Sequence, residues 1–175
     1  MAVVKTLSTV ITNRDATPPV INDARLRGGT LKSGVGSVAV GAADSATSYY
    51  PLVEVPSTAM VRGVFATNVT GMTTLAGNVG VFKNTKNANG VTTGVAANTG
   101  SDTIFASAAS FAAAQNHVAV DALLTTDKRE QPLWQAIGLT ADPGGTFDIG
   151  VAVTTANTGA AGRLGLEVQY VDNSN

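Results

Sequence analysis

The chain of 175 residues contains no cysteine and only one histidine. The absence of cysteine excludes disulfide bonds, thiol nucleophiles and cysteine-based zinc sites. Any catalytic triad or histidine metal site would therefore have to use His117. Its neighbours Asn116 and Ala119 offer no second metal ligand, although Asp121 would share its face of a strand-like run. We predict that His117 is a structural residue at the end of a loop, that the chain is not an enzyme, and that it has no metal site.

Charge is also scarce. Charged residues make up 13% of the chain, about half the share of roughly 25% in ordinary soluble domains. The formal net charge is -1, and the densest basic stretch contains only Arg25, Arg27 and Lys32. Nucleic-acid binders need a basic surface to neutralise phosphates, so we expect no nucleic-acid partner. A surface this poor in charge is instead expected to be covered by protein partners.

Long apolar runs are missing as well. No stretch approaches the roughly 20 apolar residues of a membrane-spanning helix, and the first residues lack the apolar run of a signal peptide. We therefore expect no membrane partner. The letters of Gly34–Ala39 match the dinucleotide-binding fingerprint, which requires a preceding strand and a following helix. Because Gly41 would break such a helix, we predict entry into a strand and no cofactor.

The clearest pattern that is present lies between Thr146 and Val171. Apolar residues alternate with small or polar ones in two runs, and successive side chains of a strand point to opposite faces. The residues predicted to face the core are Phe147, Ile149, Val151 and Val153 in the first run, and Leu164, Leu166, Val168 and Tyr170 in the second. Each run therefore predicts a strand with one buried face.

Similar short runs, separated by turn residues, recur along the chain from Val35 onward. The candidate strands are Val35–Gly41, Tyr49–Val55, Met60–Thr67, Asn78–Phe82, Val118–Leu124, Thr146–Thr154 and Arg163–Val171, with a loop at Asn84–Gly90. This spacing predicts an all-β fold, an antiparallel β-sandwich of jelly-roll type, because no helical crossovers intervene.

Two segments suit a helix. The alanine-rich stretch Ile104–Gln115 fits either a helix or a strand, and a strand followed by a helical turn is favoured. Pro132–Ile137 predicts one short helical turn, because proline suits the first helical position. Gly138 suits the left-handed residue that ends a helix. Leu133, Trp134 and Ile137 would bury one side of this turn.

Residues 1–33 differ from the rest and predict an extended N-terminal arm, followed by the sandwich domain at 34–175. Pro18-Pro19 favours extended backbone and cannot enter a central strand. One short strand is expected at Val3–Ile11. The arm carries enough apolar residues to dock, either on its own domain or on a neighbour; these are Val20, Ile21, Leu26 and Leu31.

Candidate interface residues come from the arm, the Tyr49-Tyr50 pair and the mixed-sign cluster at 127–130. Neighbouring residues of a strand face opposite ways, so one of the two tyrosines is expected to be exposed. The cluster fits either a solvated loop or an ion pair between subunits. The residues proposed for contact with a capsid or another subunit are Arg14, Asp15, Pro18, Pro19, Arg25, Arg27, Tyr50, Lys128 and Arg129.

Four segments resemble small virion structural proteins of tailed bacteriophages: Thr12–Pro18, Tyr50–Ser57, Phe105–Ala108 and, above all, Pro132–Pro143. The resemblance implies a capsid decoration, or cement, protein that clamps the major capsid protein lattice on the surface of the virion and is assembled in the host cytoplasm. It implies no active-site residue. A homo-oligomer, dimer or trimer, is expected.

Two other functions stay open from the sequence. A tail or head-fibre component, or a carbohydrate-binding β module, would use an exposed tyrosine at Tyr49 or Tyr50. A small glycan hydrolase would use carboxylates, with Asp121 and His117 as its candidate residues.

Overall fold

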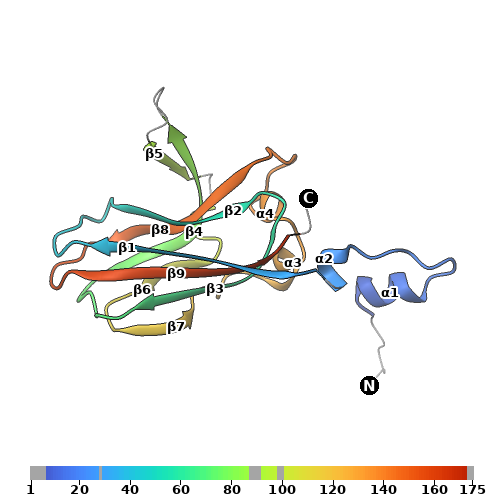
Figure 1. The fold of residues 1–175 in the computed structure, drawn as a ribbon, viewed down its shortest axis with the longest axis horizontal. Coiled ribbons are helices and arrows are strands. Elements are labelled where there is room, and N and C mark those ends of the chain that lie inside the picture. The colour runs from blue at the N-terminus through green and yellow to red at the C-terminus, as the bar shows by residue number, and fades with distance from the viewer. Residues whose placement is uncertain (1–6, 28, 87–91, 98–100, 173–175) are drawn as a thin grey trace, which may run out of the picture.

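The computed structural model describes residues 7–27, 29–86, 92–97 and 101–172. Two antiparallel sheets pack face to face, and an N-terminal arm projects from one end along the long axis (Figure 1). The elements are α1 (Thr9–Asp15), α2 (Ala24–Arg27), β1 (Leu31–Val40), β2 (Tyr49–Pro56), β3 (Met60–Asn68), β4 (Ala76–Lys86), β5 (Thr92–Ala97), β6 (Ala106–Ser110), β7 (Gln115–Ala119), α3 (Thr126–Arg129), α4 (Leu133–Ala136), β8 (Thr146–Thr155) and β9 (Gly162–Val171).

The strands are arranged in a four-stranded sheet of order β1-β9-β3-β7 and a five-stranded sheet of order β2-β8-β4-β5, with β6 also paired to β4. All pairs are antiparallel. Along the chain, β1 to β4 alternate between the two sheets, and so do β7 to β9. The predicted all-β antiparallel sandwich is confirmed, and its jelly-roll character stays a prediction.

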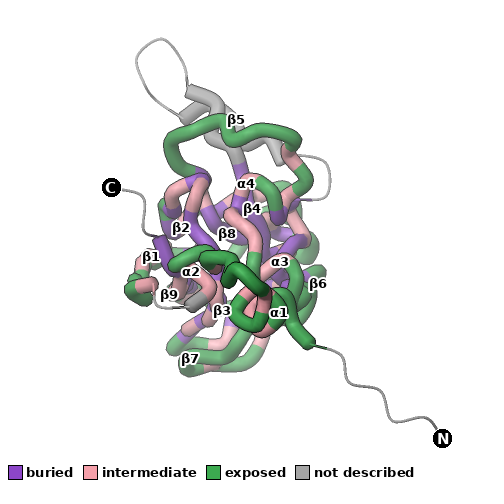
Figure 2. The backbone as a smooth tube through the Cα atoms, turned by 90° about the vertical axis from the view of Figure 1, so that its right-hand side faces the viewer, coloured by how far each residue is buried: buried purple, intermediate pink, exposed green. Residues whose placement is uncertain are grey.

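The core lies between the two sheets, and Figure 2 marks the buried residues along the backbone in purple. The predicted inward residues of β8 and β9 are buried, with Tyr170 partly buried beside them. Phe105 and Phe111 are fully enclosed from the segment around β6. Alternation therefore identified the core correctly, because in a sandwich each strand has one face toward the other sheet.

Several strand bounds differ from the prediction. Strand β1 begins at Leu31, where it pairs with Val171 at the end of β9. Strand β4 runs on to Lys86 and pairs with β5, which the sequence did not predict. The predicted loop at Asn84–Gly90 is thus wrong for 84–86, and 87–91 lie outside the described residues. Backbone pairing formed this hairpin without an alternating apolar pattern.

The predicted strand Val118–Leu124 is wrong for most of its length. Strand β7 is Gln115–Ala119, and Leu124 closes a turn by donating its N–H to the Asp121 carbonyl at 3.0 Å. Val120 and Leu124 are both buried, so the apolar spacing there reflects a turn packed on the core. In Ile104–Gln115, the strand is confirmed as β6, and the helical turn after it is wrong, because residues 112–113 form a bend.

The helical turn at Pro132–Ile137 is confirmed as α4. Pro132 precedes the helix as its N-cap, with extended backbone, and Gly138 adopts the predicted left-handed conformation at φ +84°. The N–H groups of Leu133 and Trp134, which have no partner within the helix, donate to the Ala59 and Ser57 carbonyls between β2 and β3, at 2.8 and 3.1 Å. This short helix therefore stabilises the corner where the chain passes from one sheet to the other.

Candidate interaction surfaces

The arm begins with a helix where the sequence predicted a strand. In α1, the Ser8 hydroxyl accepts a hydrogen bond from the Ile11 N–H at 3.5 Å, and the Thr12 N–H donates to the Ser8 carbonyl at 2.9 Å. A serine N-cap satisfies N–H groups that a strand would leave for a partner. The prediction of a strand over Val3–Ile11 is therefore wrong from Leu7 onward, and residues 1–6 lie outside the described part.

Hydrogen bonds within the arm fold it back on itself. The Asn22 side chain donates to the Val10 carbonyl at 3.0 Å and accepts from the Asn13 side chain at 2.9 Å. The Val20 N–H donates to the Asn13 carbonyl at 3.0 Å. These bonds hold Pro18–Ile21, which we call the arm tip, in a defined position. Within the tip, Val20 is 53% exposed and Ile21 is 95% exposed.

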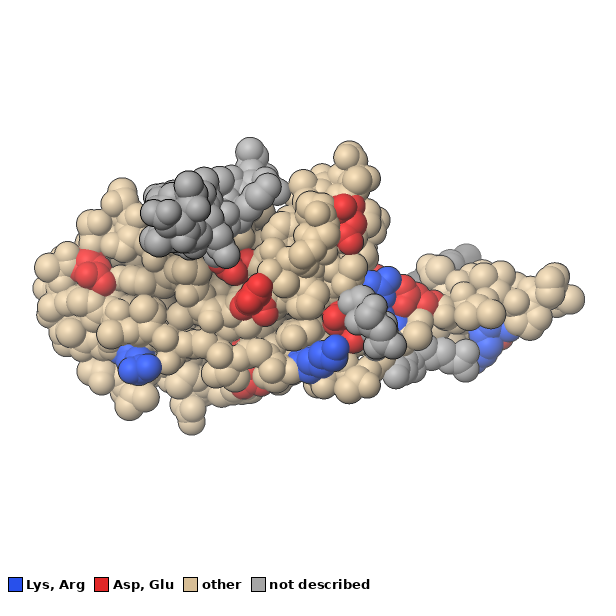
Figure 3. All heavy atoms as spheres, turned by 45° about the horizontal axis from the view of Figure 1, so that its top comes forward, with Lys and Arg blue, Asp and Glu red and all other residues tan. Residues whose placement is uncertain are grey.

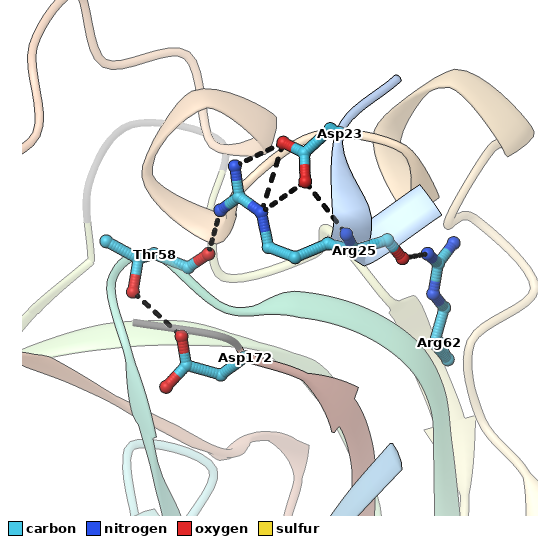
Figure 4. A network of polar contacts seen from close by, with 5 residues as sticks. All are labelled: Asp23, Arg25, Thr58, Arg62 and Asp172. Carbon is cyan, nitrogen blue, oxygen red and sulfur yellow. Dashed lines mark hydrogen bonds and ion pairs between the residues drawn. The ribbon is translucent and has the colours of Figure 1, made fainter. Parts of the chain in front are cut away.

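The base of the arm, in contrast, is fixed to the sandwich by polar contacts (Figure 4). Arg25 forms an ion pair with Asp23 at 2.7 Å and donates from Nη1 to the Thr58 carbonyl at 2.8 Å. Arg62 of β3 donates from Nη2 to the Arg25 carbonyl at 2.7 Å. The hydrogen bond from Arg25 lowers the pKa of the Asp23 carboxyl. We call these residues the arm root.

A third arginine, Arg129, extends the arm root into the body. Arg62 donates from Nη1 to the Arg129 carbonyl at 2.9 Å, and Arg129 donates in return to the Arg62 carbonyl. Arg129 also pairs with Asp121 at 3.0 Å, and this largely buried carboxylate accepts the Val64 N–H at 3.3 Å. Arg62 of β3 therefore satisfies a backbone carbonyl of α3, and Arg129 of α3 satisfies a backbone carbonyl of β3.

The predicted interface residues of the arm and of the 127–130 cluster lie in two settings, near the arm tip and in the arm root. Arg14 and Asp15 form an exposed ion pair at 2.7 Å near the arm tip, which contains the exposed Pro18 and Pro19. Arg25 and Arg129 lie in the arm root, and Lys128 is half-buried beside them on α3. Arg27 ends α2, but its side chain lies outside the described part. Their use at an interface stays a prediction.

Sequence reasoning missed Arg62, which joins Arg25 to Arg129. It stands alone among apolar residues of β3, and no spacing in the sequence marks it as a contact between segments 37 and 67 residues apart. On the face drawn in Figure 3, charged side chains are few, and several of them lie where the arm leaves the sandwich.

The expectation that one of the two adjacent tyrosines is exposed is wrong. Tyr50 is only 8% exposed and donates its hydroxyl to Asp44, and burial raises the pKa of its phenol. Tyr49 is half-buried, with its ring edge-on to Phe82 at 4.3 Å between centroids. One tyrosine faces the core, and an aromatic neighbour in the five-stranded sheet packs against the other.

A hollow of about 320 Å³ lies on the outer face of the four-stranded sheet. It forms because Gly165 of β9 has no side chain between its cross-strand neighbours Ser37 and Thr67. Val35 and Val69 border the hollow and are 75% and 81% exposed. We call this feature the outer hollow; the residues that line it are Val35, Gly36, Ser37, Thr67, Val69, Arg163, Gly165, Leu166 and Glu167.

Opposite charges stand at two sides of the outer hollow. The Arg163 side chain donates to the Ser37 hydroxyl at 3.0 Å. Glu167 accepts from Gln169 at 3.1 Å and from Ser33 at 3.0 Å, and these hydrogen bonds, the Gln169 bond foremost, lower the pKa of its carboxyl. The glutamate is therefore ionised at neutral pH.

His117 supports this glutamate. Its Nε2 lies 3.2 Å from Glu167, and its ring stacks on Phe65 with centroids 4.2 Å apart. It belongs to β7, so the prediction of a position at a loop end is wrong, and its carboxylate partner is Glu167 where Asp121 was expected to share its face. Asp121 is instead bound by Arg129.

Within the described residues, no group of three or more histidine, aspartate and glutamate side chains is placed to hold a metal ion. No helix in that same part of the chain is long and apolar enough to cross a membrane. The arm, with its exposed tip and fixed root, and the outer hollow are candidate interaction surfaces of the described part.

Two solved structures contain chains of similar fold. A chain of the cyanophage Pam1 capsid asymmetric unit is 23% identical, with a TM-score of 0.52, and the match covers 87% of this chain and 98% of that chain. A chain of the capsid of Ralstonia phage GP4 is 16% identical, with a TM-score of 0.58, and the match covers 84% and 87%. No protein-family model and no curated protein matches the chain. At these identities the likeness shows a shared fold.

Proposed function

We propose that this chain is a structural protein of a bacteriophage virion, a decoration protein that binds the lattice of major capsid protein and stabilises the head. The observation that carries the proposal is the shared fold with chains of two phage capsids, which spans nearly the whole of those chains. On this proposal the chain acts by binding alone, on the capsid surface, after assembly in the host cytoplasm.

The division of the molecule into a sandwich and a projecting arm supports the proposal. A decoration protein strengthens a shell when one copy contacts more than one lattice subunit, because linked weak contacts multiply. An arm adds contact area to the roughly 1,600 Å² of a standard interface. The exposed ion pair of Arg14 and Asp15 lies on α1, none of whose residues is buried in the isolated chain.

Carbohydrate binding has less support. That alternative depended on an exposed tyrosine, and Tyr50 is buried while Tyr49 is half-buried against Phe82. Glycan hydrolysis depended on Asp121 and His117, which are occupied by Arg129 and Glu167. No described feature favours either function over binding to a protein lattice.

The proposal is tested by counting copies in purified particles with quantitative mass spectrometry. We expect a copy number comparable to that of the major capsid protein, whereas a few copies per particle would indicate a tail or fibre component. Purified protein should also bind particles from which it has been stripped and raise the temperature at which they release their genome. Failure to bind stripped particles would contradict the proposal.

A further inference from the structure

The arm tip is an exposed apolar projection, and the outer hollow is a depression with an apolar border on the same chain. We infer that the arm tip of one copy inserts into the outer hollow of a second copy, and that this contact joins copies of the chain into a closed oligomer. The inference goes beyond the proposed function, because it concerns contacts between copies of this chain and holds without any capsid.

The arm tip is built as an apolar projection. Val20 and Ile21 are adjacent and largely exposed, although an isoleucine in a folded domain is usually buried. The side chains of Asn13 and Asn22 hold the tip in place through hydrogen bonds at 2.9 and 3.0 Å. A tip held in one conformation loses little conformational entropy on binding, which favours association.

The outer hollow offers a matching surface. Its volume of about 320 Å³ lies at the lower end of the roughly 300–1,000 Å³ typical of binding pockets. Val35 and Val69 give it an apolar border, and its floor is low at Gly165, which has no side chain between Ser37 and Thr67. Two apolar side chains of an arm tip would cover the exposed valines.

The charges beside the two surfaces are complementary. Arg163 and Glu167 lie four residues apart on β9, which corresponds to roughly 13 Å along a strand, and both line the hollow. The arm carries the ion pair of Arg14 and Asp15, which is about half exposed. In a docked arm, Asp15 can exchange this partner for Arg163, and Arg14 can exchange it for Glu167.

The arm cannot reach the hollow of its own chain. The arm root fixes Arg25 to the Thr58 carbonyl at one end of the sandwich, and from there the arm runs away from the body (Figure 1). The hollow lies along β1 and β9 beyond the root, toward the end where Ser37 pairs with Gly165. A hollow that the tip occupies must therefore belong to another copy, either reciprocally in a dimer or around a ring.

The absence of cysteine allows a direct test by disulfide formation. An Ile21→Cys variant is mixed with a Val69→Cys variant of different mass and mildly oxidised. We expect a mixed disulfide dimer from this pair. The control replaces Val69→Cys with Leu123→Cys, a residue of similar size that is 48% exposed and outside the hollow. Equal yields with both partners, or no dimer with Val69→Cys, would overturn the inference.

A second test fills the hollow. A side chain added at Gly165 would make only ordinary contacts, with its Cβ 3.5 Å from the Gly36 and Thr67 carbonyl oxygens, and valine is favoured in strands. Gly165→Val should therefore fold normally and weaken self-association at least tenfold in sedimentation equilibrium. The control Ala119→Val adds the same side chain at an exposed position of β7 and should leave self-association unchanged.

Two outcomes separate this inference from the proposed function. A wild-type chain that stays monomeric at several hundred micromolar overturns the inference. It does not affect the proposed function, which binding to stripped particles tests separately. If Ile21→Asp abolishes particle binding while Gly165→Val changes neither particle binding nor self-association, the arm tip binds the capsid protein instead. That result also overturns the inference and supports the proposed function.

Discussion

The sandwich and the arm of this protein differ in what surrounds their apolar side chains. In the sandwich, Phe105 and Ile149 are completely enclosed, whereas in the arm Ile21 is 95% exposed and α1 has no buried residue. The sandwich is thus stabilised by burial between two sheets. The arm is held by hydrogen bonds between its own asparagines and by arginines at its root.

This difference separates stability from binding within one small chain. Changes in the sandwich should alter the free energy of unfolding, while changes at the arm tip should alter only what the protein binds. The arm root lies between these regions, since Arg62 of β3 donates both to the Arg25 carbonyl of the arm and to the Arg129 carbonyl of the body. Substitutions in each region therefore test whether the two properties are independent.

The largest effect is expected from Phe105→Ala, which should lower the free energy of unfolding by about 3–5 kcal/mol, because it removes a fully buried aromatic ring and leaves a cavity. Ile21→Ala is the matched change in the arm and should leave the unfolding midpoint unaltered. Urea denaturation followed by circular dichroism measures both. A clear loss of stability in Ile21→Ala would show that the arm tip packs on its own body.

Gly36→Ala should lower the free energy of unfolding by about 3 kcal/mol. The added Cβ would lie 1.8 Å from the Leu52 carbonyl oxygen, so backbone atoms of β1 or β2 would have to move. Gly165→Ala is the control, because its Cβ would meet nothing nearer than 3.5 Å. Comparison of the two thermal midpoints tests how tightly the sheets pack, and equal midpoints would contradict the observed packing.

Arg129→Ala should lower the free energy of unfolding by about 2 kcal/mol. It leaves the largely buried Asp121 carboxylate without its guanidinium partner and removes a donor to the Arg62 carbonyl. Lys128→Ala, the same loss of charge on the same helix, should change the urea midpoint far less. In hydrogen exchange, we expect Arg129→Ala to lower the protection of amides in both β3 and the arm. That result would show that the arm root couples the stability of the arm to that of the sandwich.

The smallest effect concerns acid pH and is confined to the arm root. The Arg25 hydrogen bond lowers the pKa of Asp23 in the folded protein, so the pair stabilises the root above the unfolded pKa of about 4. That contribution is lost as pH falls through the lowered folded pKa. Protection factors of arm amides should therefore decrease between pH 7 and pH 3 while those of β8 and β9 persist.

Asp23→Asn provides the control for this pH dependence. Asparagine cannot form the ion pair at either pH, so the arm of this variant should show the same protection at pH 7 and pH 3. An unchanged pH response in Asp23→Asn would assign the acid effect to another carboxyl group.

Prediction from the sequence succeeded where one face of a strand is buried. The alternation in β8 and β9, the turn at Pro132–Ile137 and the left-handed Gly138 were all correct. Each of these features depends on local backbone geometry or on a period of two, which neighbouring residues reveal.

Prediction failed where another part of the chain supplies the explanation. Strand β5 has no alternating pattern and pairs with β4 through backbone hydrogen bonds. The spacing at Val120 and Leu124 suggested a strand, but both side chains enter the core from a turn. The arm begins with a helix that Ser8 caps, and the prediction of a strand there did not consider this local signal.

The sequence by itself determined the sandwich, because alternating burial requires only the order of residues along each strand, and it determined that no cysteine chemistry is present. Tertiary structure alone decided the arm root and the outer hollow. Arg62 reaches Arg25 and Arg129 across long separations, and the hollow needs Gly165 to lie between Ser37 and Thr67. Such features depend on strand pairing and register, which bring distant residues together and which local sequence does not encode.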